Sequence, residues 1–172
     1  MEERNFPELS DELMQQWLAV KPSNDRGRIL YRPCKVTLKN GEEVECVYVI
    51  EAQKYIDWWG VWPDKDEGKK EIKISEVVRI EESLHRLPPD IANKIYHAGE
   101  SGMGYCIFSL IFSDGYRQAV VSGNAVDFVR LPNGKKQSEI VDVEPHEGIN
   151  DQSRYNSLDY HWCLFGKGIS RF

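Results

Sequence analysis

The 172-residue chain lacks the features that mark membrane-spanning, secreted and metal-binding proteins. No apolar run approaches the roughly 20 residues that a membrane-spanning helix needs. Residues 1–5 are charged and contain no apolar signal core. The histidines are not spaced with one another or with a cysteine as metal ligands are. We therefore expect a cytoplasmic protein with no membrane partner, no metal site and no cofactor.

Cysteine is sparse and unpaired in the sequence. No CxxC pair occurs. In a reducing compartment such residues stay free and behave as small apolar side chains. We expect four free thiols, which are Cys34, Cys46, Cys106 and Cys163.

Positive charge is in the minority. The chain has 22 Lys and Arg against 28 Asp and Glu, which gives a net charge of −6. A negative protein is repelled by phosphate backbones, so a nucleic-acid partner is disfavoured. The expected partner is another protein, and the charge favours a basic one. The remaining balance, 41% hydrophobic and 29% charged, is that of a globular domain with its own core.

Turn signals and apolar periodicity indicate mainly β structure. Asn40-Gly41 and Asp114-Gly115 are strong hairpin turns. Helical spacing of Leu9, Leu13 and Trp17 predicts a helix that begins near Pro7 and ends before Pro22, and prolines and Gly99 bound a second helix at 88–97. Strands are expected at 35–38, 44–50, 55–62, 72–74, 77–80, 107–112, 120–121, 125–131, 140–143 and 158–164.

Two stretches of the sequence echo each other. Gly-Lys-Lys at 68–70 leads to Ser-Glu-Val-Val at 75–78, and Gly-Lys-Lys at 134–136 leads to Ser-Glu-Ile-Val at 138–141. A hairpin, a middle strand, a turn and a closing strand are typical of a small SH3-like barrel. We predict two tandem SH3-like barrels in which 77–81 and 140–144 are equivalent closing strands. A single larger barrel or an α+β sheet is the alternative.

This fold divides the chain into five parts. They are an N-terminal helix and linker (1–29), a first barrel (30–86), a bridging helix and glycine-rich loop (87–104), a second barrel (105–148) and an aromatic C-terminal extension (149–172).

Residues 86–89, 96–105 and 123–128 resemble a family of bacterial proteins with tandem SH3-like barrel units. The resemblance covers about the middle half of the chain. It implies a bacterial cytosolic origin and the SH3-like fold. It implies no activity, cofactor or partner.

An aromatic cluster is the strongest local anomaly of the sequence. On a strand, Tyr55 and Trp59 share one face, while Trp58 and Trp62 share the other. Only one face can fill a barrel. One pair must therefore cover the N-terminal helix, the second barrel, the tail or a partner, and tryptophan is favoured at binding hot spots. All four residues are predicted binding residues.

The loop 99–104 is the second candidate. Gly99 and Gly104 have the spacing of a phosphate loop, but Tyr105-Cys106 stands where that motif needs Lys and Ser or Thr. Ser101 has the first glycine of a nucleophile elbow but Met103 in place of the second. Two interpretations of the loop remain: a tight turn, or a nest of backbone amides that binds an anion. The predicted binding residues here are Glu100, Ser101, Gly102, Met103 and Gly104.

We predict a non-catalytic binding protein, with no catalytic residue assigned. One version is an immunity or antitoxin protein whose acidic surface covers a basic toxin. The first alternative is a small hydrolase that uses Ser101, His146 or Asp127. The second is a nucleic-acid-binding barrel that uses the lysines of the two Gly-Lys-Lys turns.

Overall fold

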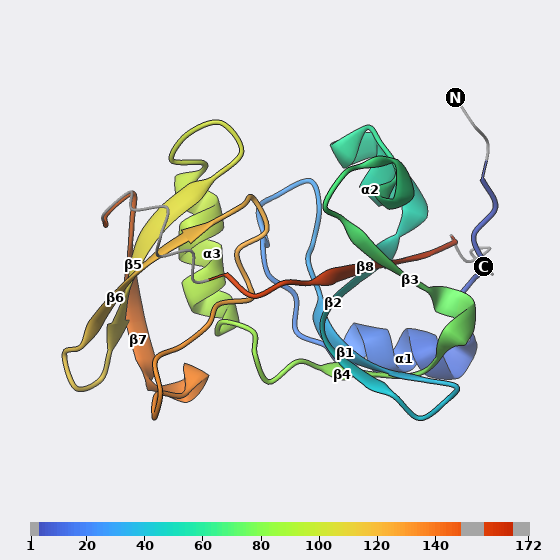
Figure 1. Ribbon diagram of the computed structural model, residues 1–172, viewed down its shortest axis with the longest axis horizontal. Helices are drawn as coiled ribbons and strands as arrows, with labels where there is room; N and C mark the ends of the chain where they lie inside the picture. The colour runs from blue at the N-terminus through green and yellow to red at the C-terminus, as the bar shows by residue number, and fades with distance from the viewer. Residues whose placement is uncertain (1–3, 149–156, 167–172) are drawn as a thin grey trace. The chain divides into compact units, whose positions relative to one another are not determined.

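The computed structural model describes residues 4–148 and 157–166, which are mainly β (Figure 1). Within these ranges there are two sheets and three α-helices. The chain forms two compact units. Unit 1 contains residues 1–21, 31–83 and 160–172, and unit 2 contains residues 22–30 and 84–159, in each case where described. Neither sheet closes into the predicted barrel.

Unit 1 is a five-stranded sheet with two α-helices. Its elements are α1 (Asp11–Ala19), β1 (Pro33–Leu38), β2 (Glu43–Glu51), α2 (Ala52–Trp59), η1 (Pro63–Lys65), β3 (Lys70–Lys73), η2 (Ile74–Glu76), β4 (Val77–Glu82) and β8 (His161–Phe165). The strand order is β3-β8-β2-β1-β4. Strand β8, red in Figure 1, runs parallel to both β2 and β3. The strand expected at 158–164 is thus confirmed over 161–164.

Unit 2 is a three-stranded antiparallel sheet packed against one α-helix. Its elements are α3 (Pro89–Ala98), β5 (Cys106–Phe112), β6 (Arg117–Ser122), η3 (Gln137–Glu139) and β7 (Ile140–Pro145), in the order β6-β5-β7. Ile91 and Ile95 of α3 are buried against Phe108 and Leu110 of β5. Gly99, with φ of 76°, ends the helix as predicted.

The two units contain the same supersecondary element. In unit 1, β1 forms a hairpin with β2 and pairs on its other side with β4; in unit 2, β5 forms a hairpin with β6 and pairs with β7. The closing strands pair in the same register, with one bulged residue, Val78 or Val141, left out of each ladder, whereas only the hairpin of unit 1 has a further shift, between Cys34 and Val36. Matching pairs are Val36↔Ile80 with Leu110↔Val143, Thr37↔Arg79 with Ile111↔Asp142, and Leu38↔Val77 with Phe112↔Ile140.

The likeness extends to single hydrogen bonds. Lys39 N donates to Glu76 O at 2.9 Å, and Ser113 N donates to Glu139 O at 2.8 Å. In both repeats a side-chain oxygen covers an edge-strand amide, which blunts the edge against further pairing. These two bonds are Ile80 N to Gln16 Oε1 and Val143 N to Asp142 Oδ1, both 2.8 Å. The predicted equivalence of 77–81 and 140–144 is confirmed. That they belong to SH3-like units stays a prediction.

Three expected elements differ in the structure. The segment expected as a strand at 55–62 is helix α2 up to Trp59, and Gly60 with φ of 75° ends it. The segment 125–131 forms only single bridges, from Phe128 and Val129. Helix α1 begins at Asp11 because the Ser10 hydroxyl caps it by accepting from Leu13 N at 3.2 Å.

All four cysteines are free and buried. Burial raises the pKa of the Cys46 thiol to about 12 and, with the lesser influence of Glu100, raises that of Cys106. These thiols are therefore protonated at neutral pH. None of the helices in the described ranges is long and apolar enough to cross a membrane.

Candidate functional site

The aromatic cluster predicted from residues 55–62 divides into an inner and an outer part. Tyr55 and Trp59, four residues apart on α2, lie on one helix face; Tyr55 is fully buried and Trp59 half-buried. Trp58 faces outward and is 49% exposed. Trp62 lies beyond the helix, where the Phe6 ring packs on it with centroids 5.2 Å apart. Only Trp58 of the four therefore presents a largely free ring.

Three rings of unit 1 form an aromatic cage, which we define as Tyr55, Trp59 and Trp162. The Trp162 centroid lies 5.0 Å from that of Tyr55 and 5.6 Å from that of Trp59. The Lys69 ammonium lies over the Trp59 ring, with Nζ 3.7 Å from the centroid. Nζ is also 5.5 Å and 5.7 Å from the other two centroids. Such distances are those of a cation–π interaction.

Polar groups complete the seat of the Lys69 ammonium. Nζ donates to the Tyr55 hydroxyl at 3.3 Å and lies 3.1 Å from Asp66 Oδ2. Burial, followed by the nearby Asp66 carboxylate, raises the pKa of Tyr55, so its hydroxyl stays neutral. The cage therefore offers a cation three aromatic surfaces, one hydroxyl and one carboxylate.

Two indole N–H groups in the cage have no acceptor among the described residues. They are Nε1 of Trp59 and Nε1 of Trp162, both buried. Leaving a buried donor unpaired costs about 1–3 kcal/mol.

The predicted loop at 99–105 is compact. Ser101 N donates to Tyr105 O at 3.0 Å, and a Cβ added to Gly102 would meet the Tyr105 ring at 2.3 Å. The Gly104 amide, which an anion-binding nest would use, donates to the loop's own Glu100 carboxylate at 3.2 Å. Met103 at the tip is 97% exposed. The loop favours the tight-turn interpretation and presents one apolar side chain to solvent.

The structure brings two of the proposed hydrolase residues together. Ser101 Oγ and His146 Nδ1 are 2.8 Å apart. His146 Nε2 is 2.9 Å from Ala98 O, which only accepts, so in the neutral ring Nε2 carries the proton and Nδ1 accepts from Ser101. Ser101 Oγ also accepts from Ile107 N at 2.8 Å and lies 3.3 Å from Ile107 O. The pair is a serine with an oriented base, held tightly to backbone.

Asp127, the third hydrolase candidate, lies elsewhere in unit 2. It is fully buried, and its oxygens accept from the Ser23 hydroxyl and the Tyr96 hydroxyl, each at 2.6 Å. Both ring nitrogens of His146 already have other partners. Asp127 is therefore a structural carboxylate that ties α3 to the segment near Ser23.

The first lysine of each Gly-Lys-Lys turn is folded back on the protein. Lys69 occupies the aromatic cage. Lys135 pairs with Asp114 and lies 5.4 Å and 5.3 Å from the ring centroids of Phe112 and Tyr116. Both of these ammonium groups are largely covered, whereas the second lysines of the turns, Lys70 and Lys136, are exposed.

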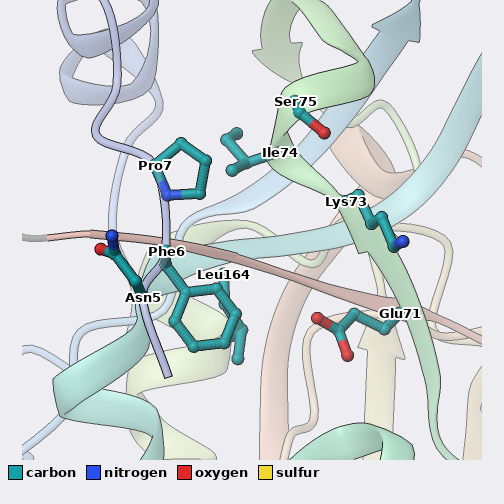
Figure 2. Close-up of a pocket in the computed structure, with 8 residues that line it drawn as sticks. All are labelled: Asn5, Phe6, Pro7, Glu71, Lys73, Ile74, Ser75 and Leu164. Atoms are coloured by element: carbon teal, nitrogen blue, oxygen red, sulfur yellow. The ribbon is translucent and has the colours of Figure 1, made fainter. Parts of the chain in front are cut away.

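A surface pocket of about 200 Å³ lies elsewhere in unit 1. Figure 2 shows the Phe6 ring beside Leu164, with Glu71 and Lys73 across from them. The lining residues are Asn5, Phe6, Pro7, Glu71, Lys73, Ile74, Ser75 and Leu164, none of which the sequence marked as a site residue. Burial, and then Asp64, raises the pKa of Glu71. Among the residues described, no three His, Cys, Asp or Glu side chains gather as metal ligands.

Comparison of the chain with protein-family models, with curated proteins and with solved structures gives no match.

Proposed function

We propose that this is a non-catalytic protein of the bacterial cytosol that binds a basic protein partner through unit 1. The observation that carries the proposal is the Lys69 ammonium on the Trp59 ring, 3.1 Å from Asp66. This surface already holds a lysine head group, which is the chemistry that a basic partner would present. The net charge of −6 adds long-range attraction for such a partner.

Trp58 gives unit 1 an exposed apolar anchor. It follows the cage residue Tyr55 by three positions on α2 and exposes 49% of its surface. A large exposed tryptophan beside a cation seat has the composition of an interface hot spot. A partner that combines lysine with apolar side chains suits both features, as a basic toxin held by an immunity or antitoxin protein would.

The test is calorimetric titration with a 20-residue peptide of alternating Lys and Leu, and with the matched Glu and Leu peptide. We expect the lysine peptide alone to bind, and Trp58→Ala to weaken binding at least about tenfold. Tyr116→Ala is the control, because Tyr116 is exposed to a similar extent (48%) in unit 2. Equal affinity for the two peptides, or equal losses in the two variants, would refute the proposal.

We also propose that the two repeats are SH3-like units that remain open. The shared order of hairpin, 3₁₀ turn and closing strand, with the closing strands in the same register, supports this. An experimental structure whose repeats fail to overlay on the central strands of an SH3 barrel would exclude it.

A small hydrolase is the second candidate, favoured by the 2.8 Å contact between Ser101 Oγ and His146 Nδ1. Oγ would attack an ester carbonyl as its proton moves to Nδ1, and that proton would then pass to the departing alcohol. Water, deprotonated by the same nitrogen, would release the acid and restore the serine. A fluorophosphonate should then label wild-type protein and leave Ser101→Ala and His146→Ala unlabelled. Absence of labelling in wild type would rule this function out.

A further inference from the structure

We propose that the aromatic cage is a lysine-recognition site that Lys69 occupies within its own chain, and that a lysine side chain of the partner displaces it. This inference rests on the proposed function and names the group that the site takes. Lys69 would then act as an internal competitor that sets how strongly an incoming lysine must bind.

The contacts of Lys69 define the chemistry of the incoming group. The rings of Tyr55, Trp59 and Trp162 would accept any cation of suitable size. The Tyr55 hydroxyl at 3.3 Å accepts an N–H, and the Asp66 carboxylate at 3.1 Å is placed to accept another. A primary ammonium has three such donors, whereas a quaternary ammonium has none. The cage should therefore select lysine over trimethyllysine.

The position of Lys69 makes the exchange feasible. Lys69 lies in the turn between Gly68, with φ of 84°, and Lys70, the first residue of β3. Its contacts with the cage are made by its side chain. Its side chain and that of Asp66 are 19% and 34% exposed, so solvent and a partner reach both. Ion pairs of this kind contribute little to stability. Loss of the contact would leave β3 and α2 in place.

The second repeat supplies an internal reference. Lys135 is the equivalent lysine of its Gly-Lys-Lys turn and also pairs with an aspartate, Asp114. Its ammonium is more than 5 Å from both neighbouring ring centroids, and those rings belong to Phe112 and Tyr116 of one hairpin. A variant of Lys135 therefore removes the same charge without opening a cage.

The test uses Nα-acetyl-lysine methylamide, whose side-chain ammonium is free, as the ligand and the full chain as the protein. Binding is followed by the indole ¹H–¹⁵N signals of Trp59 and Trp162. Lys69→Ala should bind the ligand at least about tenfold more tightly than wild type, because the linked competitor is gone. Lys135→Ala should match wild type. The trimethylated ligand should bind Lys69→Ala at least about fivefold more weakly than the primary amine.

Equal affinity of wild type and Lys69→Ala, or an equal gain in Lys135→Ala, would overturn the inference. So would equal binding of the two ligands. If Lys69→Ala melts at a lower temperature than wild type, the comparison is repeated with Lys69→Met, whose side chain keeps the rings covered. If the lysine peptide binds through Trp58 while neither Lys69 variant responds to the small ligand, the proposed function stands and the cage mechanism falls. If the peptide also fails to bind, both fall.

Discussion

Truncation of single tryptophans should distinguish the buried cage, represented by Trp162 of β8, from the exposed side of α2, represented by Trp58. Trp162, at the centre of the cage, is 1% exposed and contacts five other rings, those of Tyr31, Tyr48, Tyr55, Trp59 and Tyr160. Replacing a fully buried tryptophan by alanine costs roughly 3–5 kcal/mol, from lost burial and the cavity left behind. Trp58 is 49% exposed, and its replacement should cost less than about 1 kcal/mol.

These costs convert to distinct melting temperatures. In a chain of this length, 1 kcal/mol shifts the melting temperature by about 2–4 °C. Trp162→Ala should therefore lower it by roughly 6–20 °C, and Trp58→Ala by at most about 4 °C. Differential scanning calorimetry, with peptide binding measured alongside, gives both readouts. A loss of stability in Trp58→Ala as large as that in Trp162→Ala would show that Trp58 is covered, and would refute its role as an exposed anchor.

Further predictions concern thiols, acid stability, the buried carboxylate and the sheet edge. Because burial raises the pKa of Cys46 to about 12, iodoacetamide at pH 8 should leave it unmodified in native protein and modify it fully in guanidinium, as mass spectrometry would show. The hydrogen bond from Lys94 lowers the pKa of Asp142, so this pair stabilises the fold above about pH 4 and loses that effect as the pH falls. In Lys94→Ala, the urea concentration at the midpoint of unfolding should therefore decrease less on acidification than it does in wild type. Asp127→Asn weakens two buried hydroxyl bonds and should cost about 2 kcal/mol or more in urea unfolding, whereas an unchanged free energy of unfolding would show that these bonds do not stabilise the fold. Gln16→Ala should expose the Ile80 amide, which hydrogen exchange would detect as faster exchange at that residue alone.

Local signals in the sequence predicted the hairpins and α3 well. Asn40-Gly41 and Asp114-Gly115 turn where expected, since their φ > 0 positions are occupied by glycine. The sequence repeat also marked a real structural repeat. A 3₁₀ turn precedes the closing strand in both repeats, and the apolar residues of the repeat form the buried face of that strand.

The error at α2 has a definite physical cause. Residues four apart share a face in a strand and in a helix alike, so Tyr55 and Trp59 fit both periods. Glycine at 60, a frequent helix terminator, was the signal that could have decided between them. The strand pattern places Trp58 on the face opposite Tyr55, whereas on α2 it lies less than one turn beyond Tyr55 and is 49% exposed.

The cage itself could not be predicted, because it joins residues without any local relation. Trp162 reaches Tyr55 through the parallel pairing of β8 with β2, and no turn signal specifies a pairing across that separation. Lys69 belongs to a turn in the sequence, and only the rings around it in the structure show that its ammonium is covered. Ser101 and His146 were each proposed separately, but no spacing rule joins residues 45 positions apart.

The position of β8 has a consequence for synthesis of the chain. It lies between β2 and β3, yet it is made after every residue of unit 2. On the ribosome, unit 2 can complete its helix and sheet while unit 1 still lacks an interior strand. The cage remains incomplete for the same interval, because Trp162 is on that strand. The chain therefore acquires its proposed binding surface last, and a nascent chain stopped before residue 161 would display α2 without its cage.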